Sequence, residues 1–211
     1  MKKNHIGLKV FLTAASVLST IGASNSLELC KAILCRDIDR AQILINYGAD
    51  VNEINRYGNS LLHEAIAYGD SCVNMAVLLI MRGACVNVPG SNKDTPLHFA
   101  AQLPQSPQNR ALIDFLIQNG ACVNIRNHSG ETPIYSAVFS GNIWAIKLLI
   151  KGGANFNIPD NEGITPLGRA ILLERDRAIL LERDRDGDGD GDGVAAFLIE
   201  IGAIFTHYSL E

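Results

Sequence analysis

The most chemically suggestive stretch of the sequence is an acidic run near its C-terminal end. Four Asp-Gly pairs follow one another from Asp186 to Gly193. Alternating carboxylates are typical of EF-hand loops, in which a glutamate at the twelfth position is the bidentate calcium ligand. The twelfth residues counted from Asp184, Asp186 and Asp188 are all apolar: Ala195, Phe197 and Ile199. A specific calcium site is therefore disfavoured, and a calcium-dependent regulator or enzyme accessory that uses this insert stays the alternative interpretation.

The histidines and cysteines form no catalytic or metal-binding set. His63 and His98 each lie three residues after a Ser or Thr in two similar segments, and no histidines share a metal-ligand spacing. The chain has an odd number of cysteines, namely Cys30, Cys35, Cys72, Cys85 and Cys122. None of them forms a Cys-x-x-Cys motif. This pattern indicates neither a disulfide framework nor a zinc site. No glycine-rich phosphate loop occurs either, so we expect no catalytic residue, no metal and no cofactor.

The composition restricts the kind of protein and its partners. With 211 residues and 47% hydrophobic residues, the chain can build one core or one extended array. The chain has a net charge of −4 and so lacks the excess of Lys and Arg that binding to nucleic-acid phosphates requires. An ordinary apolar fraction and a small net charge also argue against disorder. We therefore expect a folded protein that does not bind nucleic acid.

The first 24 residues combine an early positive charge, a short apolar run and small residues. Lys2 and Lys3 precede the run Val10–Leu18, and Ala23 offers a cleavage position. This order is typical of a secretory signal. The run is short and contains Thr13, so it does not predict a stable membrane span. The alternative is an amphipathic helix that covers the apolar end of the following domain, in which case the protein stays cytoplasmic.

Two markers recur along the chain with one period. Gly-Ala pairs are spaced by 35, 37, 33 and 49 residues and begin at Gly48, Gly83, Gly120, Gly153 and Gly202. A second marker, Ser/Thr followed by Pro or Leu and an aliphatic residue, stays in register and begins at Ser60, Thr95, Thr132 and Thr165. A fixed period of this length predicts a repeat architecture.

Each repeat has the pattern of a finger followed by two helices. Thr-Pro is a favourable helix start, because the hydroxyl can cap backbone donors and proline has no amide hydrogen to lose. Leu97, Ala100 and Ala101 then form one apolar stripe. A second helix is predicted over Ile143–Lys151, and Gly153 can end it in the left-handed conformation. The turn-rich stretch that follows predicts a hairpin-like finger.

These features resemble the ankyrin repeat family, whose repeats have a period of 33 residues. The family's Thr-Pro-Leu-His-x-Ala signature matches Thr95–Ala100. The resemblance implies an all-α repeat solenoid of helix-turn-helix units joined by fingers, over residues 25–208. We expect five units, at about 25–54, 55–89, 90–126, 127–159 and 160–208. The first lacks Thr-Pro, as suits a capping repeat. The resemblance also implies that His63 and His98 form hydrogen bonds between repeats.

The last unit contains an insertion with a visible origin. The eight residues 170–177 are repeated without change as 178–185, and the Asp-Gly pairs follow. The second copy should extend the first helix of the unit, with its apolar residues rotated by about 80°. We interpret residues 178–193 as a duplication tolerated at the surface, since loop length costs little stability.

By resemblance to the family, certain finger and first-helix positions point into a concave groove. They are Arg56, Tyr57, Asn59, Tyr68, Asn92, Asp94, Gln102, Leu103, His128, Glu131, Phe139, Asn161 and Glu162. Tyr57, Tyr68 and Phe139 are the expected anchors, because aromatic side chains dominate interface energetics. Packing between repeats is the alternative role for Phe139 and Leu103.

We therefore expect a monomeric, non-catalytic module that binds a partner protein through its groove. With a secretory signal, it would be a bacterial-type ankyrin protein, exported as an effector of an intracellular bacterium and bound to a host protein. The partner itself cannot be derived from the sequence, because ankyrin-like surfaces bind unrelated proteins.

Overall fold

The computed structural model describes residues 25–69, 73–181 and 193–202, with side chains up to residue 174 and again from 193. A helix over residues 25–34 opens this part of the chain. The following helices are α2 Ile38–Asn46, α3 Leu61–Ala67, α4 Val73–Met81, α5 Pro96–Gln102, α6 Pro107–Gln118, α7 Pro133–Phe139, α8 Ile143–Lys151, α9 Pro166–Leu181 and α10 Gly193–Glu200. The described residues form no strand, so the all-α repeat fold is confirmed.

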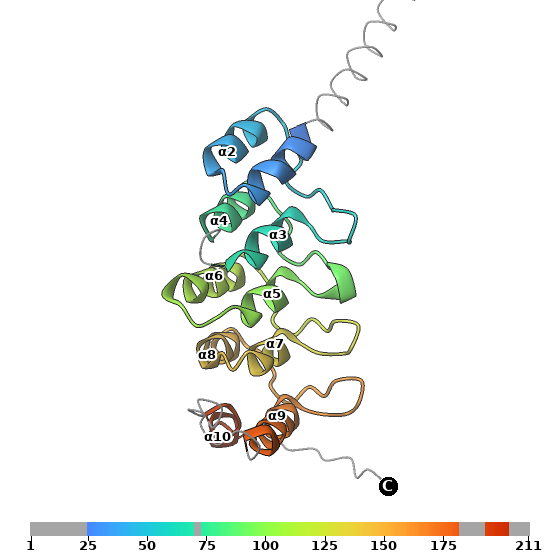
Figure 1. Cartoon of the computed structure of the whole chain (residues 1–211), viewed down its shortest axis with the longest axis vertical. Coiled ribbons are helices and arrows are strands. Elements are labelled where there is room, and N and C mark those ends of the chain that lie inside the picture. Colours follow the sequence, from blue (N-terminus) through green and yellow to red (C-terminus); the bar gives the residue numbers. More distant parts are fainter. Residues whose placement is uncertain (1–24, 70–72, 182–192, 203–211) are drawn as a thin grey trace, which may run out of the picture.

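The helices stack in two columns. The shorter helices α3, α5 and α7 form an inner column with α9, and α2, α4, α6, α8 and α10 form an outer column beside it, on the left in Figure 1. Each inner helix contacts its neighbours in the column, as α5 contacts α3 and α7. Leucine, isoleucine and alanine fill the core between the columns, with Leu97, Ala100 and Ala101 fully buried. The fingers project from the inner column along one side (Figure 1).

A capping box containing a histidine starts two of the inner helices. The Thr95 amide and hydroxyl lie 3.1 and 2.9 Å from His98 Nδ1. Because a backbone N–H can only donate, Nδ1 accepts and the neutral ring carries its proton on Nε2. Nε2 then donates to the Glu131 carbonyl of the next unit at 3.1 Å. His63 makes the same contacts, so the expected inter-repeat role of both histidines is present in the structure.

The equivalent position changes in the last two units. Tyr135 places its hydroxyl 2.8 Å from the Ile158 carbonyl and 2.5 Å from the Ile164 carbonyl. Burial, with the nearby Asp160 carboxylate, raises the pKa of Tyr135 well above its usual value. In the final unit the position is Gly168, which has no side chain to reach a further finger.

A ladder of asparagines joins successive units, at the point where each second helix leads into the next finger. Asn87 donates from Nδ2 to the Gly120 carbonyl at 2.8 Å and accepts the Cys122 amide at 2.8 Å. Asn52 and Asn124 bridge to their following units in the same way. The glycine at each of these steps has φ between +87° and +89°, which a side chain would strain.

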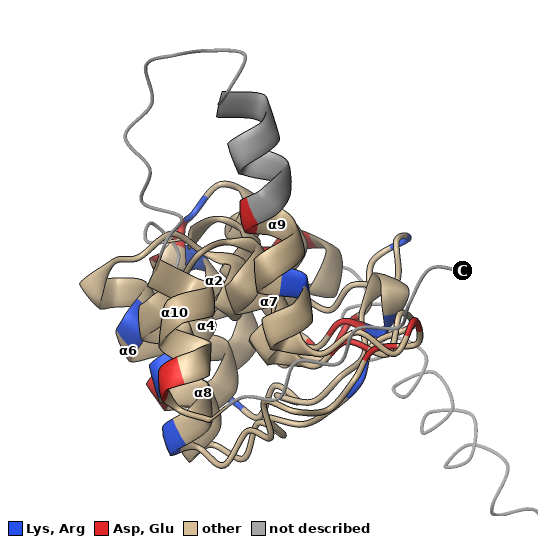
Figure 2. Ribbon diagram, turned by 90° about the horizontal axis from the view of Figure 1, so that it is seen from below, with Lys and Arg blue, Asp and Glu red and all other residues tan. Residues whose placement is uncertain are grey.

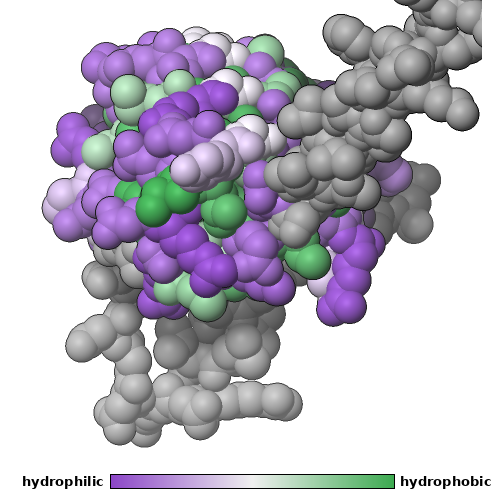
Figure 3. Space-filling view, turned by 90° about the horizontal axis from the view of Figure 1, so that it is seen from above, coloured by the Kyte–Doolittle hydropathy of each residue, from purple (hydrophilic) through white to green (hydrophobic). Residues whose placement is uncertain are grey.

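The first unit differs from the others on its outer end. Arg40 occupies the α2 position at which the next units bury Met75, Leu112 and Ala145. Its guanidinium pairs with Glu28, which also accepts from Lys31 at 2.7 Å. Hydrophilic residues therefore alternate with hydrophobic ones on this end (Figure 3). A polar outer face is what a terminal repeat requires.

The duplicated segment continues a helix, as the sequence predicts. Helix α9 runs from Pro166 to Leu181 and so passes through the first copy into the second. Residues 182–192, with the Asp-Gly pairs, lie outside the described residues, as do residues 1–24 with the signal-like pattern.

Candidate protein-binding groove

An Asx turn shapes three of the four fingers. The side chains of Asn55, Asn127 and Asp160 each accept from the amides two and four residues later, at 2.8 to 3.1 Å. Such turns are characteristic of asparagine and aspartate. In the finger of the third unit the position is Gly90, and Asn92 and Lys93 take positive φ instead. Despite this difference, the fingers project from the same side of the array (Figure 1). Acidic residues lie in them beside α7 (Figure 2).

Eight of the thirteen predicted groove residues are solvent-exposed: Arg56, Tyr57, Asn92, Gln102, His128, Phe139, Asn161 and Glu162. The other five are half-buried: Asn59, Tyr68, Asp94, Leu103 and Glu131. Tyr57 and Phe139 are 63% and 43% exposed, so both rings are accessible to a partner.

Several of these side chains hold the array together. Asn59 Oδ1 accepts from the Ser91 amide at 2.9 Å, and Asp94 accepts from Asn127 at 2.9 Å. Asn161 donates to the His128 carbonyl at 2.8 Å. These polar contacts run between neighbouring fingers, so substitution at such positions affects the shape of the groove as well as its surface.

Tyr68 and Leu103 lie partly in the core. Both pack against buried residues, as one of the two alternatives for Leu103 anticipates. The Arg36 guanidinium lies 5.4 Å from the centre of the Tyr68 ring. Tyr68 therefore offers a partner less surface than Tyr57 or Phe139.

A cleft opens where the fingers of the fourth and fifth units meet the inner helices. Its volume is about 310 Å³, and it is lined by Ser129, Glu131, Phe139, Asp160, Asn161, Glu162 and Arg169. Four of these are predicted groove residues, and the structure brings them together: Glu131, Phe139, Asn161 and Glu162. A concave site lined by an aromatic ring and a few polar groups is suited to ligand binding.

Comparison with known proteins decides the family. The sequence model described as ankyrin repeats (3 copies) matches residues 23–127 and 97–186, which together cover most of the chain. The chain belongs to the ankyrin repeat family. Two potassium channels described as AKT1, from Oryza sativa subsp. indica and subsp. japonica, are each 36% identical over 78 residues. That match covers 37% of this chain but 8% of each channel.

Arg169 is a cleft residue of this ankyrin repeat protein that the sequence analysis missed. Its guanidinium pairs with the buried carboxylate of Asp160 and lies 3.2 Å from Glu162. It also lies 5.8 Å from the centre of the Phe139 ring. Although burial acts in the opposite direction, the two carboxylates raise the pKa of Arg169. The sequence signal is an arginine four residues after Thr165, on the first turn of α9 and next to an acidic finger.

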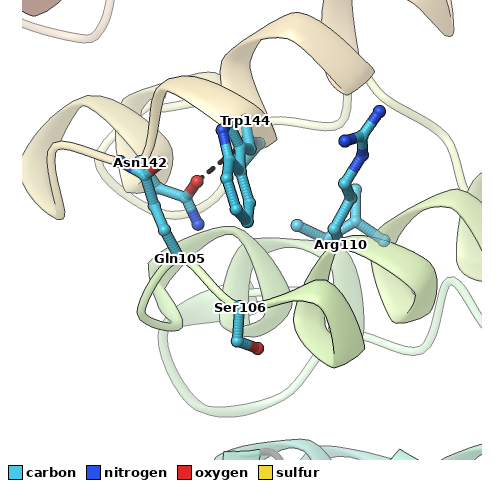
Figure 4. Close-up of a pocket in the computed structure, with 7 residues that line it drawn as sticks. Gln105, Ser106, Arg110, Asn142 and Trp144 are labelled. Atoms are coloured by element: carbon cyan, nitrogen blue, oxygen red, sulfur yellow. Dashed lines mark hydrogen bonds between the residues drawn. The ribbon is translucent and has the colours of Figure 1, made fainter.

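Other chemistry finds little support among the described residues of the ankyrin array. They include no group of three metal-ligating side chains, and their cysteines Cys30, Cys35, Cys85 and Cys122 are free thiols. None of their helices is both long enough and apolar enough to cross a membrane. A notch between α6 and α8, beside Arg110 and Trp144, leaves no room for a bound molecule (Figure 4).

Proposed function

We propose that this ankyrin repeat protein binds a partner protein through its concave face, without catalysing a reaction. The observation that carries the proposal is the alignment of fingers and inner helices, which gathers exposed aromatic and polar side chains on one face. Repeat solenoids use such concave surfaces for binding. The cleft beside Phe139 adds a recess in which a partner side chain can be desolvated, as interface anchors are.

The double variant Tyr57→Ala, Phe139→Ala should lose at least ten-fold in affinity for proteins that the wild-type chain captures from a lysate. Each exposed ring contributes anchoring area on the groove, and truncating an anchor residue commonly costs about 2 kcal/mol. Quantitative mass spectrometry of the captured proteins measures the loss. Trp144→Ala is the matched control, because this ring is 38% exposed but lies on α8 in the outer column.

Equal capture by the groove variant and the wild type would contradict binding through the concave face. Loss of capture by Trp144→Ala alone would place the interface on the outer helices instead. Circular dichroism of each variant should match the wild type, because none of the three rings belongs to the fully buried core.

We further propose that the protein is exported and acts on a host protein. The support is the sequence of residues 1–24 alone, with its lysines, apolar run and Ala23. N-terminal sequencing of the mature protein should therefore begin after Ala23. An intact Met1 in every cellular fraction would contradict export and leave the groove proposal unaffected.

A further inference from the structure

The cleft between the fingers of the fourth and fifth units carries an excess of negative charge among its lining residues. Asp160 is buried, and Arg169 compensates its charge. Glu162, whose side chain is 68% exposed, shares the Arg169 guanidinium with Asp160, and Glu131 accepts from Asn127 at 3.2 Å. The lining of the cleft therefore holds three carboxylates and one cation. An acidic ligand would be repelled here, and an apolar one would cover these carboxylates without pairing them.

Phe139 forms the apolar wall of the same cleft. Its ring is 43% exposed, and the guanidinium of Arg169 already lies 5.8 Å from its centre. The protein thus holds one cation of its own between carboxylates and this ring. A second cation can use the same combination, because aromatic faces attract guanidinium and ammonium groups and long basic side chains lay their stems on apolar surface.

We propose that the cleft receives an arginine or lysine side chain of the partner protein, with its charged head between Glu131 and Glu162 and its stem on Phe139. The volume of about 310 Å³ is at the low end for ligand sites and suits one long side chain. The inference rests on the proposed groove function and specifies the chemistry of its occupant. It predicts a partner with a basic residue at the centre of its interface.

NMR titration of the full chain with N-acetyl-arginine N-methylamide tests the inference. The amide signals of Ser129, Phe139 and Glu162 should shift, whereas those around Trp144 should not. The neutral isostere N-acetyl-citrulline N-methylamide should bind at least five-fold more weakly, because it lacks the charge. The variant Glu131→Gln, Glu162→Gln should weaken arginine binding by about five-fold or more, given two lost charge pairs.

A matched control removes the same two charges elsewhere. Asp114→Asn, Glu200→Gln changes α6 and α10 in the outer column and should leave the arginine affinity unchanged. Equal binding of arginine and citrulline, tighter binding of N-acetyl-glutamate N-methylamide, or equal losses in the two double variants would each overturn the inference. Partner capture that depends on Phe139 but not on Glu131 and Glu162 would overturn it as well, while the groove function would stand.

Discussion

Replacing Arg169 by methionine should lower the free energy of unfolding by about 2 to 3 kcal/mol. The methionine keeps most of the apolar stem, but the Asp160 carboxylate, whose side chain is 1% exposed, loses its counter-charge. Removing one partner of a buried ion pair typically costs about 3 to 5 kcal/mol. We expect the lower value here because the Arg169 side chain is 20% exposed and water screens part of its charge. Urea denaturation measures the change.

The repeat supplies a natural control for this prediction. Asn55 and Asn127 occupy the position of Asp160 in other fingers and accept the same pair of backbone amides without carrying a charge. Adding Asp160→Asn to Arg169→Met should therefore restore stability to within about 1 kcal/mol of the wild type. The explanation fails if the double variant is no more stable than the single one.

Acidification from pH 7.5 to pH 5 should destabilise the array through His63 and His98. Burial lowers the pKa of both side chains below the ordinary value of 6.5, against the raising effect of their bonds to the Asp94 and Glu131 carbonyls. A histidine whose pKa is lower in the folded than in the unfolded protein stabilises the fold when the pH is above its unfolded-state pKa. This contribution is lost as the pH falls toward the folded-state pKa. The loss should reach about 1.4 kcal/mol per pH unit for each histidine in that window.

Glutamine provides the test of this mechanism. A glutamine at the third helical position can accept from the capping residue's amide, and it does not titrate. The variant His63→Gln, His98→Gln should therefore have a nearly constant free energy of unfolding between pH 6.5 and pH 5. The same pH dependence in variant and wild type would assign it to other groups.

Much of the fold follows from local sequence features. The Thr-Pro starts and the helix Ile143–Lys151 were predictable because caps, breakers and a 3.6-residue apolar period act within a few residues. The continuation of α9 into the duplicated segment was predictable for the same reason, since neither glycine nor proline occurs between Arg169 and Leu181. Here the local preferences and the repeat period agree.

The groove was less predictable, because it depends on which side chains meet between units. The family pattern placed Tyr57 and Tyr68 alike, but the core and the Arg36 guanidinium cover part of Tyr68. Arg169 was missed because its importance comes from Asp160, nine residues earlier, and from Phe139 in the preceding unit. Neither relation is visible without the stacking of the repeats.

The series of bonds from His63, His98 and Tyr135 gives the array a direction. Each donor lies on an inner helix and reaches forward to a carbonyl in the finger of the following unit. The effect of truncation should therefore depend on the end that is removed. Removing a unit from the C-terminal side leaves a side-chain donor without its acceptor. Removing one from the N-terminal side leaves a backbone carbonyl without its donor, and water satisfies a carbonyl more easily. With glycine at position 168, the fifth unit ends the series without a side-chain donor at this position.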